Sequence, residues 1–398
     1  MVDATMTFRS QLAKSETPAA GAGIGVLVTP ATDLSAYAEL CRSASLAPPQ
    51  SLHWVAAWYA SNQSDSLVAV VRYNSRPVYA LALDIEKSGP FRVARLMGGS
   101  HANGNFPAAD QAFLSSGAFD IGPVVAAIRA ARPDIDVLAL ERLLADRDGV
   151  ANPLAALKSF ASPNVSLAVN LEGGFDALLS RSSGKRKRKK HRAQTRKFEA
   201  AGGFRRIEAD TPAETARLLD AFFAMKALRF EQMGVANVFG DEKVRRFFHG
   251  LFAGALAETP RPFVLHGLEV GDALRAVTGS SRSGTRLICE FGAIADDELV
   301  HASPGDFLFF DNIEEACRQN MSVYDFSVGD EPYKRMWCDI ETRHFDVVIP
   351  LSAKGGMLAA RMRLAARLKA FVKNSPLIWR LAKLARRRAA GQPAGNST

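Results

Sequence analysis

Residues 263–294 read FVLHGLEVGDALRAVTGSSRSGTRLICEFGAI, and this stretch predicts three consecutive β-strands. We expect the strands at 263–270, 274–281 and 286–294, because each segment is rich in apolar and β-branched residues and is bounded by turn residues. Gly271-Asp272 predicts a tight hairpin between the first two strands. The stretch therefore indicates the sheet of a mixed α/β domain.

The elements around this stretch are predicted to follow one order in both halves of the chain: strand, two helices, three strands, helix, strand. This repeat indicates two tandem mixed α/β domains. In the first half the strands are expected at 24–29, 67–72, 78–84, 91–97, 135–140 and 165–169, and the helices at 33–43, 51–62, 121–132 and 152–160. In the second half the remaining strands are expected at 204–208, 323–328 and 344–349, and the helices at 212–233, 241–257 and 304–318.

The length supports two units, since 398 residues exceed the roughly 100 to 200 residues of a typical domain. The predicted organisation is a disordered N-terminus (1–20), an N-terminal domain (21–172), a basic helical linker (173–202), a C-terminal domain (203–352) and a basic amphipathic helical tail (353–398).

The net charge of +9 comes from two segments. Residues 181–206 hold twelve Lys and Arg against one acidic residue, and residues 347–398 hold eleven and no acidic residue. The rest of the chain has 27 basic and 40 acidic residues, so the high isoelectric point alone does not indicate a nucleic-acid-binding fold. The run KRKRKK at 185–190 is consistent with a solvated helix or with binding of a phosphate-bearing or other anionic partner.

The tail predicts an amphipathic helix, because apolar residues from Met357 to Val372 recur near helical spacing with Arg and Lys between them. After a break at 374–376 the pattern resumes from Leu377. Such a helix is expected to lie on an anionic membrane, to contact a partner or to pack on its own domain.

Four cysteines, Cys41, Cys289, Cys317 and Cys338, lack the spacing of a metal site, so we expect reduced, buried thiols and no metal. No window is apolar enough for a membrane-spanning helix, and no cleaved secretory signal is recognised. We therefore expect a cytoplasmic protein, peripheral to the inner face of the membrane if the tail binds lipid.

Three motifs in the second half carry a family resemblance: Ser303-Pro304-Gly305 before a helix, Tyr324-Asp325-Phe326, and GDEPYKRMW at 329–337. Together with the basic segment before Gly202, the spacing of Lys226, Arg229, Gly234 and Phe239, and Trp54 and Trp58, they resemble bacterial GNAT proteins of the cellulose-biosynthesis or exopolysaccharide-associated acetyltransferase family. The resemblance implies two tandem GNAT-like (acyl-CoA N-acyltransferase) domains. It also implies that two neighbouring strands part beside Ser303 and leave a slot for a thioester.

The resemblance implies acetyl-CoA or another acyl-CoA as co-substrate, with its phosphates at the turn Ser303, Pro304 and Gly305. Backbone N–H groups and the helix dipole at a helix N-terminus attract anions. The Gly-rich signature usual for this turn is absent. The competing interpretation is a plain cap, with Ser303 as N-cap, Pro304 at N1 and Asp306 at N3.

Acyl transfer to an amine needs a base, an oxyanion donor and an acid for the departing thiolate. Glu290 is the leading base candidate, because a carboxylate among Ile288, Phe291 and Ile294 is expected to have a raised pKa. Strand alternation predicts that Cys289 and Phe291 point away from the face of Glu290. Asp325 is the second base candidate, and the resemblance suggests Tyr333 as the acid.

Substrate contacts are expected from the same motif and from one loop of the first half. Lys334 and Arg335 are candidates to bind phosphate or sugar-acid groups, and Trp337 to stack on a sugar; the alternative is a solvated charged pair beside a core Trp. The loop at 101–106 offers polar groups for substrate or is an ordinary loop, and the first half is expected to act mainly as a scaffold.

Three hypotheses for the function follow. The first is acyl transfer to an amine or hydroxyl of a sugar, polysaccharide or cell-envelope precursor. The second, from a similarity to Fem-type aminoacyl-tRNA-dependent ligases, uses the basic helix to bind tRNA. The third is a non-catalytic scaffold whose tail docks to a membrane polysaccharide synthase.

Overall fold

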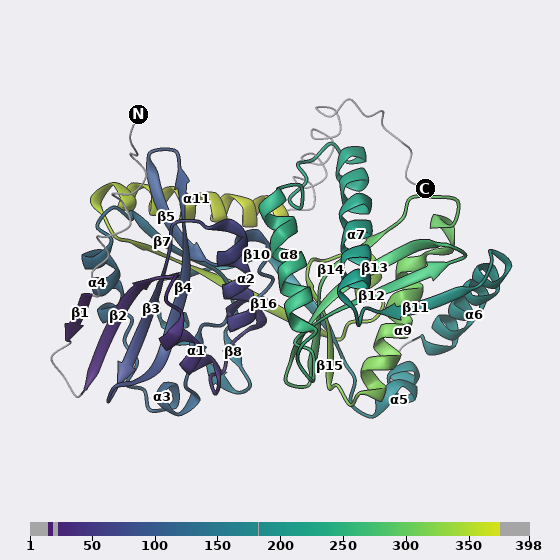
Figure 1. The fold of residues 1–398 in the computed structure, drawn as a ribbon, viewed down its shortest axis with the longest axis horizontal. Coiled ribbons are helices and arrows are strands. Elements are labelled where there is room, and N and C mark those ends of the chain that lie inside the picture. Colours follow the sequence, from purple (N-terminus) through teal and green to yellow (C-terminus); the bar gives the residue numbers. More distant parts are fainter. Residues whose placement is uncertain (1–14, 19–22, 182, 375–398) are drawn as a thin grey trace.

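The computed structural model describes residues 15–18, 23–181 and 183–374. It has a mixed α/β fold in which one continuous sheet runs through both halves of the chain (Figure 1). The strand order is β1-β2-β3-β4-β5-β7-β16-β10-β15-β14-β13-β12-β11, with β6 paired to β4. Neighbouring strands are antiparallel except β5 with β7 and β14 with β15, which are parallel.

The strands have the following bounds. Those of the first half are β1 Ser15–Pro18, β2 Ile24–Pro30, β3 Ser66–Tyr73, β4 Arg76–Ser88, β5 Phe91–Leu96, β6 Ala108–Ala109, β7 Val137–Leu143, β8 Asp146–Arg147, β9 Val150–Ala151 and β10 Ser159–Asn170. Those of the second half are β11 Phe204–Glu208, β12 Phe263–Val270, β13 Ala273–Ser283, β14 Arg286–Ile294, β15 Val323–Val328 and β16 Ile340–Pro350.

The helices have the following bounds. They are α1 Ser35–Cys41, α2 Leu52–Asn62, α3 Gln111–Ser115, α4 Gly122–Ala131, α5 Gly174–Arg181, α6 Gly184–Ala200, α7 Pro212–Gln232, α8 Glu242–Ala255, α9 Pro304–Arg318, α10 Pro332–Arg335 and α11 Ala353–Asn374. The predicted order of elements is thus confirmed in both halves, and the strands at 204–208, 263–270, 286–294 and 323–328 and the helix at 304–318 have the predicted bounds.

The two halves exchange their last strands. β10, the last strand of the first half, pairs with β15 of the second half, and β16, the last strand of the second half, pairs with β7 of the first. β10 and β16 also pair with each other at the centre of the sheet. The strand expected to close the first half therefore completes the sheet of the second, and the reverse holds for the final strand.

The helix expected at 152–160 is wrong. Only Pro153–Ala156 forms a single 3₁₀ turn, which Asn152 caps by accepting a hydrogen bond from the Leu154 amide. Ser159 onward belongs to β10, because its backbone pairs with β16 from Ser159 opposite Val347. Long-range strand pairing here overrides a local apolar spacing that is typical of a helix.

Both ends of the described chain form regular secondary structure. Within the N-terminus predicted to be disordered, Ser15–Pro18 forms β1 and pairs with β2; residues 1–14, 19 and 20 lie outside the described residues. The tail forms α11 up to Asn374, and the predicted continuation from Leu377 lies outside the described residues.

All four cysteines are free, and Cys289 is the one that is fully buried.

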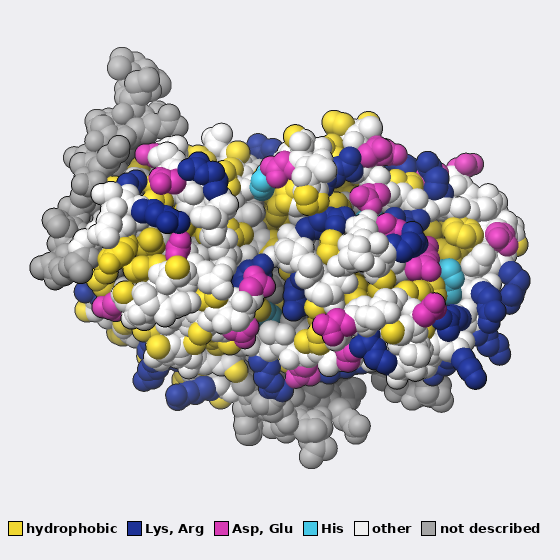
Figure 2. All heavy atoms as spheres, turned by 90° about the horizontal axis from the view of Figure 1, so that it is seen from below, with side chains coloured by type: hydrophobic (Ala, Val, Ile, Leu, Met, Phe, Trp, Pro, Cys, Tyr) yellow, Lys and Arg dark blue, Asp and Glu magenta, His cyan; other side chains and the backbone are white. Residues whose placement is uncertain are grey.

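The basic helix α6 packs on the second half along one face. Its Phe198 is buried, and His191 stacks on Phe307 and Phe310 of α9 and contacts Asp311 at 2.8 Å. Its other face is exposed, and Figure 2 shows Lys and Arg side chains gathered at the end of the molecule where Figure 1 places α6. The exposed basic residues are Lys185, Arg186, Arg188, Lys189, Lys190, Arg192, Arg196 and Lys197.

An aromatic core joins the two halves on the face of the sheet that α2 and α8 cover. Trp54 and Trp58 of α2 lie edge-on to Phe247 of α8, with ring centroids 4.9 and 5.0 Å apart. Trp54 also contacts Phe263 of β12. Because this core draws on both halves, the loops of the first half are held over the strands of the second.

Candidate active site

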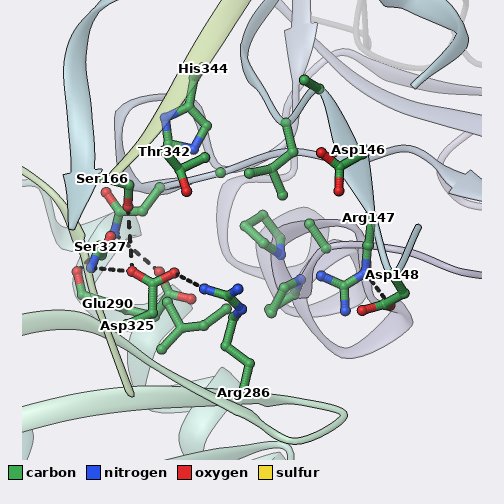
Figure 3. A pocket seen from close by; sticks show the side chains of 18 residues that line it. Asp146, Arg147, Asp148, Ser166, Arg286, Glu290, Asp325, Ser327, Thr342 and His344 are labelled. Atoms are coloured by element: carbon green, nitrogen blue, oxygen red, sulfur yellow. Dashed lines mark hydrogen bonds and ion pairs between the residues drawn. The ribbon is translucent and has the colours of Figure 1, made fainter. Parts of the chain in front are cut away.

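A cavity of about 180 Å³ lies where the exchanged strands meet β14 and β15 (Figure 3). Side chains on four neighbouring strands, β14, β15, β10 and β16, line one part of it, and loops of the first half line the rest. The lining residues are Ala47, Pro48, Pro49, Asn103, Gly104, Leu144, Ala145, Asp146, Arg147, Asp148, Ser166, Arg286, Ile288, Glu290, Asp325, Ser327, Thr342 and His344. Both base candidates, Glu290 and Asp325, therefore lie in one cavity.

Glu290 is held by one residue from each half. Ser281 of β13 donates its hydroxyl to Oε1 at 2.6 Å. Asn103, from the loop of the first half, donates its amide to Oε2 at 3.1 Å and to the Glu290 carbonyl at 2.8 Å. Burial raises the pKa of Glu290 to about 7, against the lowering effect of these two hydrogen bonds. The expected raised pKa is confirmed, and the carboxylate changes protonation state near neutral pH.

A β-bulge in β14 aims Glu290. Gly279 of β13 pairs with Phe291 and Ser280 pairs with Cys289, so Glu290 is an extra residue in the ladder. Phe291 consequently packs against Phe222 of α7, on the same side of the sheet as the hydrogen bond between Ser281 and Glu290. Cys289 belongs instead to the apolar cluster that includes Phe309 and Phe310 of α9. The prediction that Phe291 points away from Glu290 is wrong, because the bulge interrupts strict alternation.

Asp325 is fixed by charge and by backbone. Arg286 Nη1 lies 2.9 Å from Oδ2, and the Ser327 amide donates to Oδ1 at 2.7 Å. The Ser166 hydroxyl of β10 lies 3.4 Å from Oδ1. Asp325 thus lines the cavity beside Glu290, as Figure 3 shows, with one carboxylate oxygen paired to Arg286.

Two buried polar side chains line the cavity without a hydrogen-bond partner for one atom among the described residues. They are His344 through Nδ1 and Ser327 through Oγ, with 3% and 4% of their surface exposed. Burial, with a contribution from the Arg142 charge, lowers the pKa of His344 to about 4, so its ring is neutral at pH 7. Unpaired buried polar atoms are costly, so these two are suited to bind a polar ligand.

β14 and β15 part beyond a short parallel ladder, as expected from the resemblance. They pair over three positions, from Arg286 opposite Val323 to Ile288 opposite Asp325. Beyond it, Phe309 of α9 approaches Gly292 of β14 and lies 5.0 Å from Phe326 of β15 between ring centroids. The Tyr333 ring stacks on Phe309 at 5.6 Å, and burial raises the pKa of its phenol, which is therefore protonated at pH 7. The rings of Phe309, Phe326 and Tyr333 thus pack together beside the point where the two strands part.

The turn before α9 is not a plain N-cap. Ser303 has a left-handed backbone (φ 57°), and its side chain makes no capping hydrogen bond. Gln194 of α6 donates its amide to the carbonyls of Ala302 and Ser303 at 2.8 and 3.1 Å. Lys190 Nζ lies 2.9 Å from Asp306 Oδ2, so α6 supplies a positive charge beside the helix N-terminus.

The three residues expected to contact substrate are engaged within the protein. Lys334 is buried, donates to the Val328 carbonyl at 3.0 Å and pairs with Glu331 at 2.9 Å. Trp337 is buried in the core next to Phe310, with Lys187 Nζ 4.7 Å from its ring centroid. Arg335 pairs with Asp330 and Glu341. These contacts favour the alternative of structural residues, and a substrate role for the three stays a prediction.

Sequence reasoning missed several residues of the cavity. His344 and Thr342 lie on the final strand, and Arg147 and Asp148 lie in a short hairpin of β8 and β9 that was not predicted. The loop at 101–106 was a candidate, and Asn103 within it contacts Glu290. The sequence does indicate that Thr342 and His344, two residues apart on β16, share one face of that strand. It does not indicate which strands lie next to β16 in the sheet.

Residues 185–335 match the family model described as "Acetyltransferase (GNAT) domain". This segment of the chain is similar to a GNAT acetyltransferase domain. The matched segment contains β14, β15, α9 and both base candidates. The match supports acyl transfer in general, and it does not extend to the cellulose-associated family or to a polysaccharide substrate.

Several solved structures have a similar course of the chain. FemX is 10% identical over 79% of this chain and 91% of its own, with a TM-score of 0.48. A tandem GNAT protein from the clavulanic acid biosynthesis pathway is 15% identical over 82% and 99%, with a TM-score of 0.44. L-PGS from Bacillus licheniformis is 12% identical over 80% and 96%, with a TM-score of 0.44. Likeness at this level carries no conclusion about reaction or substrate. No curated protein matches the chain significantly.

Proposed function

We propose that the protein is an acyl-CoA-dependent acyltransferase, acetyl-CoA being the first donor to test, and that Glu290 is its general base. The observation that carries this proposal is a carboxylate with a pKa of about 7, held by Ser281 and Asn103 in a polar cavity of a GNAT domain. A base whose pKa lies near the working pH is the most effective, and proton transfer of this kind contributes about 10²- to 10⁴-fold to rate.

The reaction assigns one task to each group. The acceptor nitrogen or oxygen attacks the thioester carbonyl, a new bond to the acyl carbon forms, and the carbon–sulfur bond breaks. Glu290 takes the proton that the acceptor loses. Tyr333, whose phenol is protonated at pH 7, gives a proton to the departing thiolate. Asp325 attracts an ammonium group before transfer and is the alternative base.

The gap between β14 and β15 is the proposed path of the thioester arm, and the turn Ser303, Pro304 and Gly305 the proposed phosphate site. Lys190 lies 2.9 Å from Asp306 at this turn, and Arg186 and Lys187 of α6 line the same small pocket as Asp306. Phosphates therefore meet positive side chains in place of the missing Gly-rich signature.

The acceptor is proposed to be an amine or hydroxyl of a sugar, polysaccharide or cell-envelope precursor. The cavity supports a polar acceptor, because neutral hydrogen-bonding groups, namely Asn103, Ser327, Thr342 and His344, line it beside the carboxylates. The first half then acts as part of the acceptor site, beyond the scaffold role expected for it.

A Fem-type aminoacyl-tRNA-dependent ligase is the second candidate, and the exposed basic face of α6 favours it. A non-catalytic scaffold of a membrane polysaccharide synthase is the third. The three candidates differ in the donor molecule that the protein binds: acyl-CoA, aminoacyl-tRNA or none. Donor binding is therefore the property to test.

The experiment is a thermal-shift titration with acetyl-CoA on the full chain and on Glu290→Gln. Both proteins should be stabilised, by about 2.7 kcal/mol at a ligand concentration of 100 Kd, because the variant changes the base and not the donor site. Turnover with a panel of amines and amino sugars should then be lost only in the variant. No shift with millimolar acetyl-CoA would reject the proposal, and a shift with aminoacyl-tRNA instead would favour the second candidate.

A further inference from the structure

Helix α11 has two apolar faces, and only one of them is packed. Leu358 and Ala359 are buried against Val93 and Val137 of the sheet, with Met362 beside them. On the opposite side three large apolar side chains are exposed: Met357 (67%), Leu364 (58%) and Leu368 (57%). They exceed every other large apolar side chain of the described residues in exposure. Their spacing of seven and four residues aligns them in one ridge along the helix, which we call the outer ridge.

Positive charge flanks the outer ridge on both sides. At 100° per residue, Arg361 lies on one side of it and Arg367 on the other, and both are exposed. No acidic residue occurs from 347 to the end of the chain, while eleven Lys and Arg do. The sequence after Asn374 continues with Leu377, Ile378 and Trp379 among further basic residues. Apolar side chains bordered by cations are suited to the headgroup region of an anionic bilayer.

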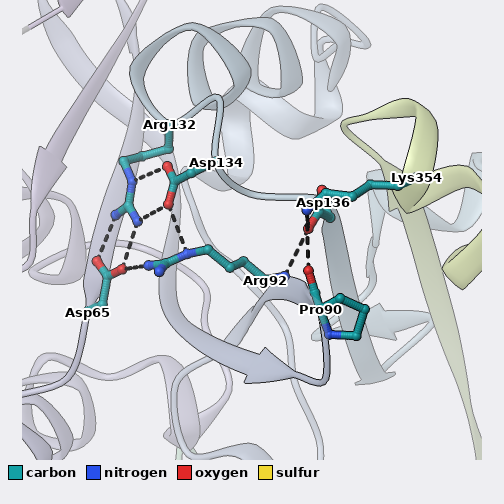
Figure 4. Close-up of polar contacts among 7 residues, drawn as sticks. All are labelled: Asp65, Pro90, Arg92, Arg132, Asp134, Asp136 and Lys354. Carbon is teal, nitrogen blue, oxygen red and sulfur yellow. Dashed lines mark hydrogen bonds and ion pairs between the residues drawn. The ribbon is translucent and has the colours of Figure 1, made fainter.

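The start of α11 is fixed to the first half, so the outer ridge has a set direction. Asp136 is buried and accepts a hydrogen bond from the Ser352 hydroxyl at 2.6 Å and from the Arg92 amide at 2.9 Å. Lys354 Nζ lies 3.0 Å from Asp136 Oδ2 and donates to the Pro90 carbonyl at 3.3 Å (Figure 4). Gly355 allows the close approach, since a Cβ there would lie 1.9 Å from the Asp136 carbonyl oxygen.

We propose that α11 docks the protein on an anionic lipid surface, lying along it with the outer ridge at the boundary of headgroups and acyl chains and its Lys and Arg at the lipid phosphates. A second copy of the chain fits this surface poorly, because pairing two outer ridges would bring like charges together. Among the described residues, no helix combines the length and the apolar character that a membrane span requires. The proposal is independent of the acyltransferase reaction.

The test is co-sedimentation of the full chain with vesicles of phosphatidylcholine containing phosphatidylserine, and with phosphatidylcholine alone. Binding is expected with the anionic vesicles, and it should fall as sodium chloride is added. Removing one surface cation by Arg361→Gln should weaken binding about fivefold, the equivalent of ~1 kcal/mol per basic residue near the surface.

The apolar contribution is tested with Leu364→Gln/Leu368→Gln, which keeps good helix formers and the net charge. This variant should bind at least about tenfold more weakly, given ~0.8 kcal/mol for each buried methylene group. The matched control is Val235→Gln, which removes an exposed apolar side chain (48%) after α7 and should bind like the parent. An unchanged thermal midpoint shows that the variants are folded.

Three results would overturn the proposal. One is the absence of binding to anionic vesicles at low salt. Another is equal binding by the parent and the Leu364→Gln/Leu368→Gln variant, with binding lost on truncation after Asn374, which would place the anchor in residues 375–398. The third is a concentration-dependent dimer, measured by light scattering, that the ridge variant dissociates.

Discussion

Glu290→Gln should make the protein more stable relative to the parent in mildly alkaline solution than in acid. The pKa of Glu290 is raised from 4.5 to about 7 in the folded state. Between these values the unfolded chain releases a proton that the folded protein keeps, so the parent loses stability as pH rises through this window. Gln does not titrate, so the variant avoids this loss.

The magnitude follows from the width of the window. The rise of the pKa from 4.5 to about 7 corresponds to ~3 kcal/mol, of which somewhat more than 2 kcal/mol develops between pH 5 and pH 8. Because Glu290 borders the cavity, solvent screening reduces the expected difference to about 2 kcal/mol. Gln still accepts from Ser281, and its mismatch with the Asn103 amide adds an offset that does not vary with pH.

The assay is urea denaturation of parent and variant at pH 5 and pH 8, with the free energy of unfolding compared at each pH. Thr342→Val is the matched control, because it alters the same cavity without removing a titratable group. A stability difference between Glu290→Gln and the parent that is the same at both pH values would refute the raised pKa, and with it the reason for choosing Glu290 as the base.

Two further predictions concern residues that hold charged groups in place. Asn103→Ala removes a hydrogen bond that lowers the pKa of Glu290, so the acid limb of the pH–rate profile should move upward by about one unit; a profile that falls in height without moving would contradict this. Burial alone would raise the pKa of Asp136, but hydrogen bonds from Ser352 and Arg92, together with Lys354, lower it overall. The charged Asp136 therefore stabilises the folded protein above the pKa of the unfolded chain, and this stabilisation is lost as pH falls through the pKa of the folded state. Asp136→Asn should therefore cost about 2 kcal/mol at pH 7 and clearly less at pH 3 by urea denaturation, and an equal cost at both would argue against the charged contact.

Local sequence signals predicted the elements of the second half well. Gly271-Asp272 marks the hairpin between β12 and β13, and Pro304 marks the start of α9, so the bounds of these elements could be predicted from turn and helix-start residues. In the first half the apolar spacing at 152–160 indicated a helix, and strand pairing with β16 prevails there instead. Periodicity predicts that a strand exists, but it does not predict its partner.

The candidate site was predictable residue by residue but not as an assembly. The apolar neighbours of Glu290 in sequence indicated its raised pKa, because burial of a carboxylate disfavours its charged form. The bulge that turns Phe291 to the same side has no signature in the sequence. His344 reaches the cavity only because β16 crosses into the centre of the sheet, and no local pattern encodes that position.

The exchange of β10 and β16 makes each half dependent on the other for its last strand. A fragment ending before β16 would leave the edge of β7 open, and a fragment beginning after β10 would leave the edge of β15 open, and open edges invite aggregation. The second half of this protein is therefore not a self-contained unit that could be excised or grafted on its own. Any change that separates the halves also removes β10 and β16 from the wall of the cavity, so the exchange ties the integrity of the pocket to the integrity of the whole chain.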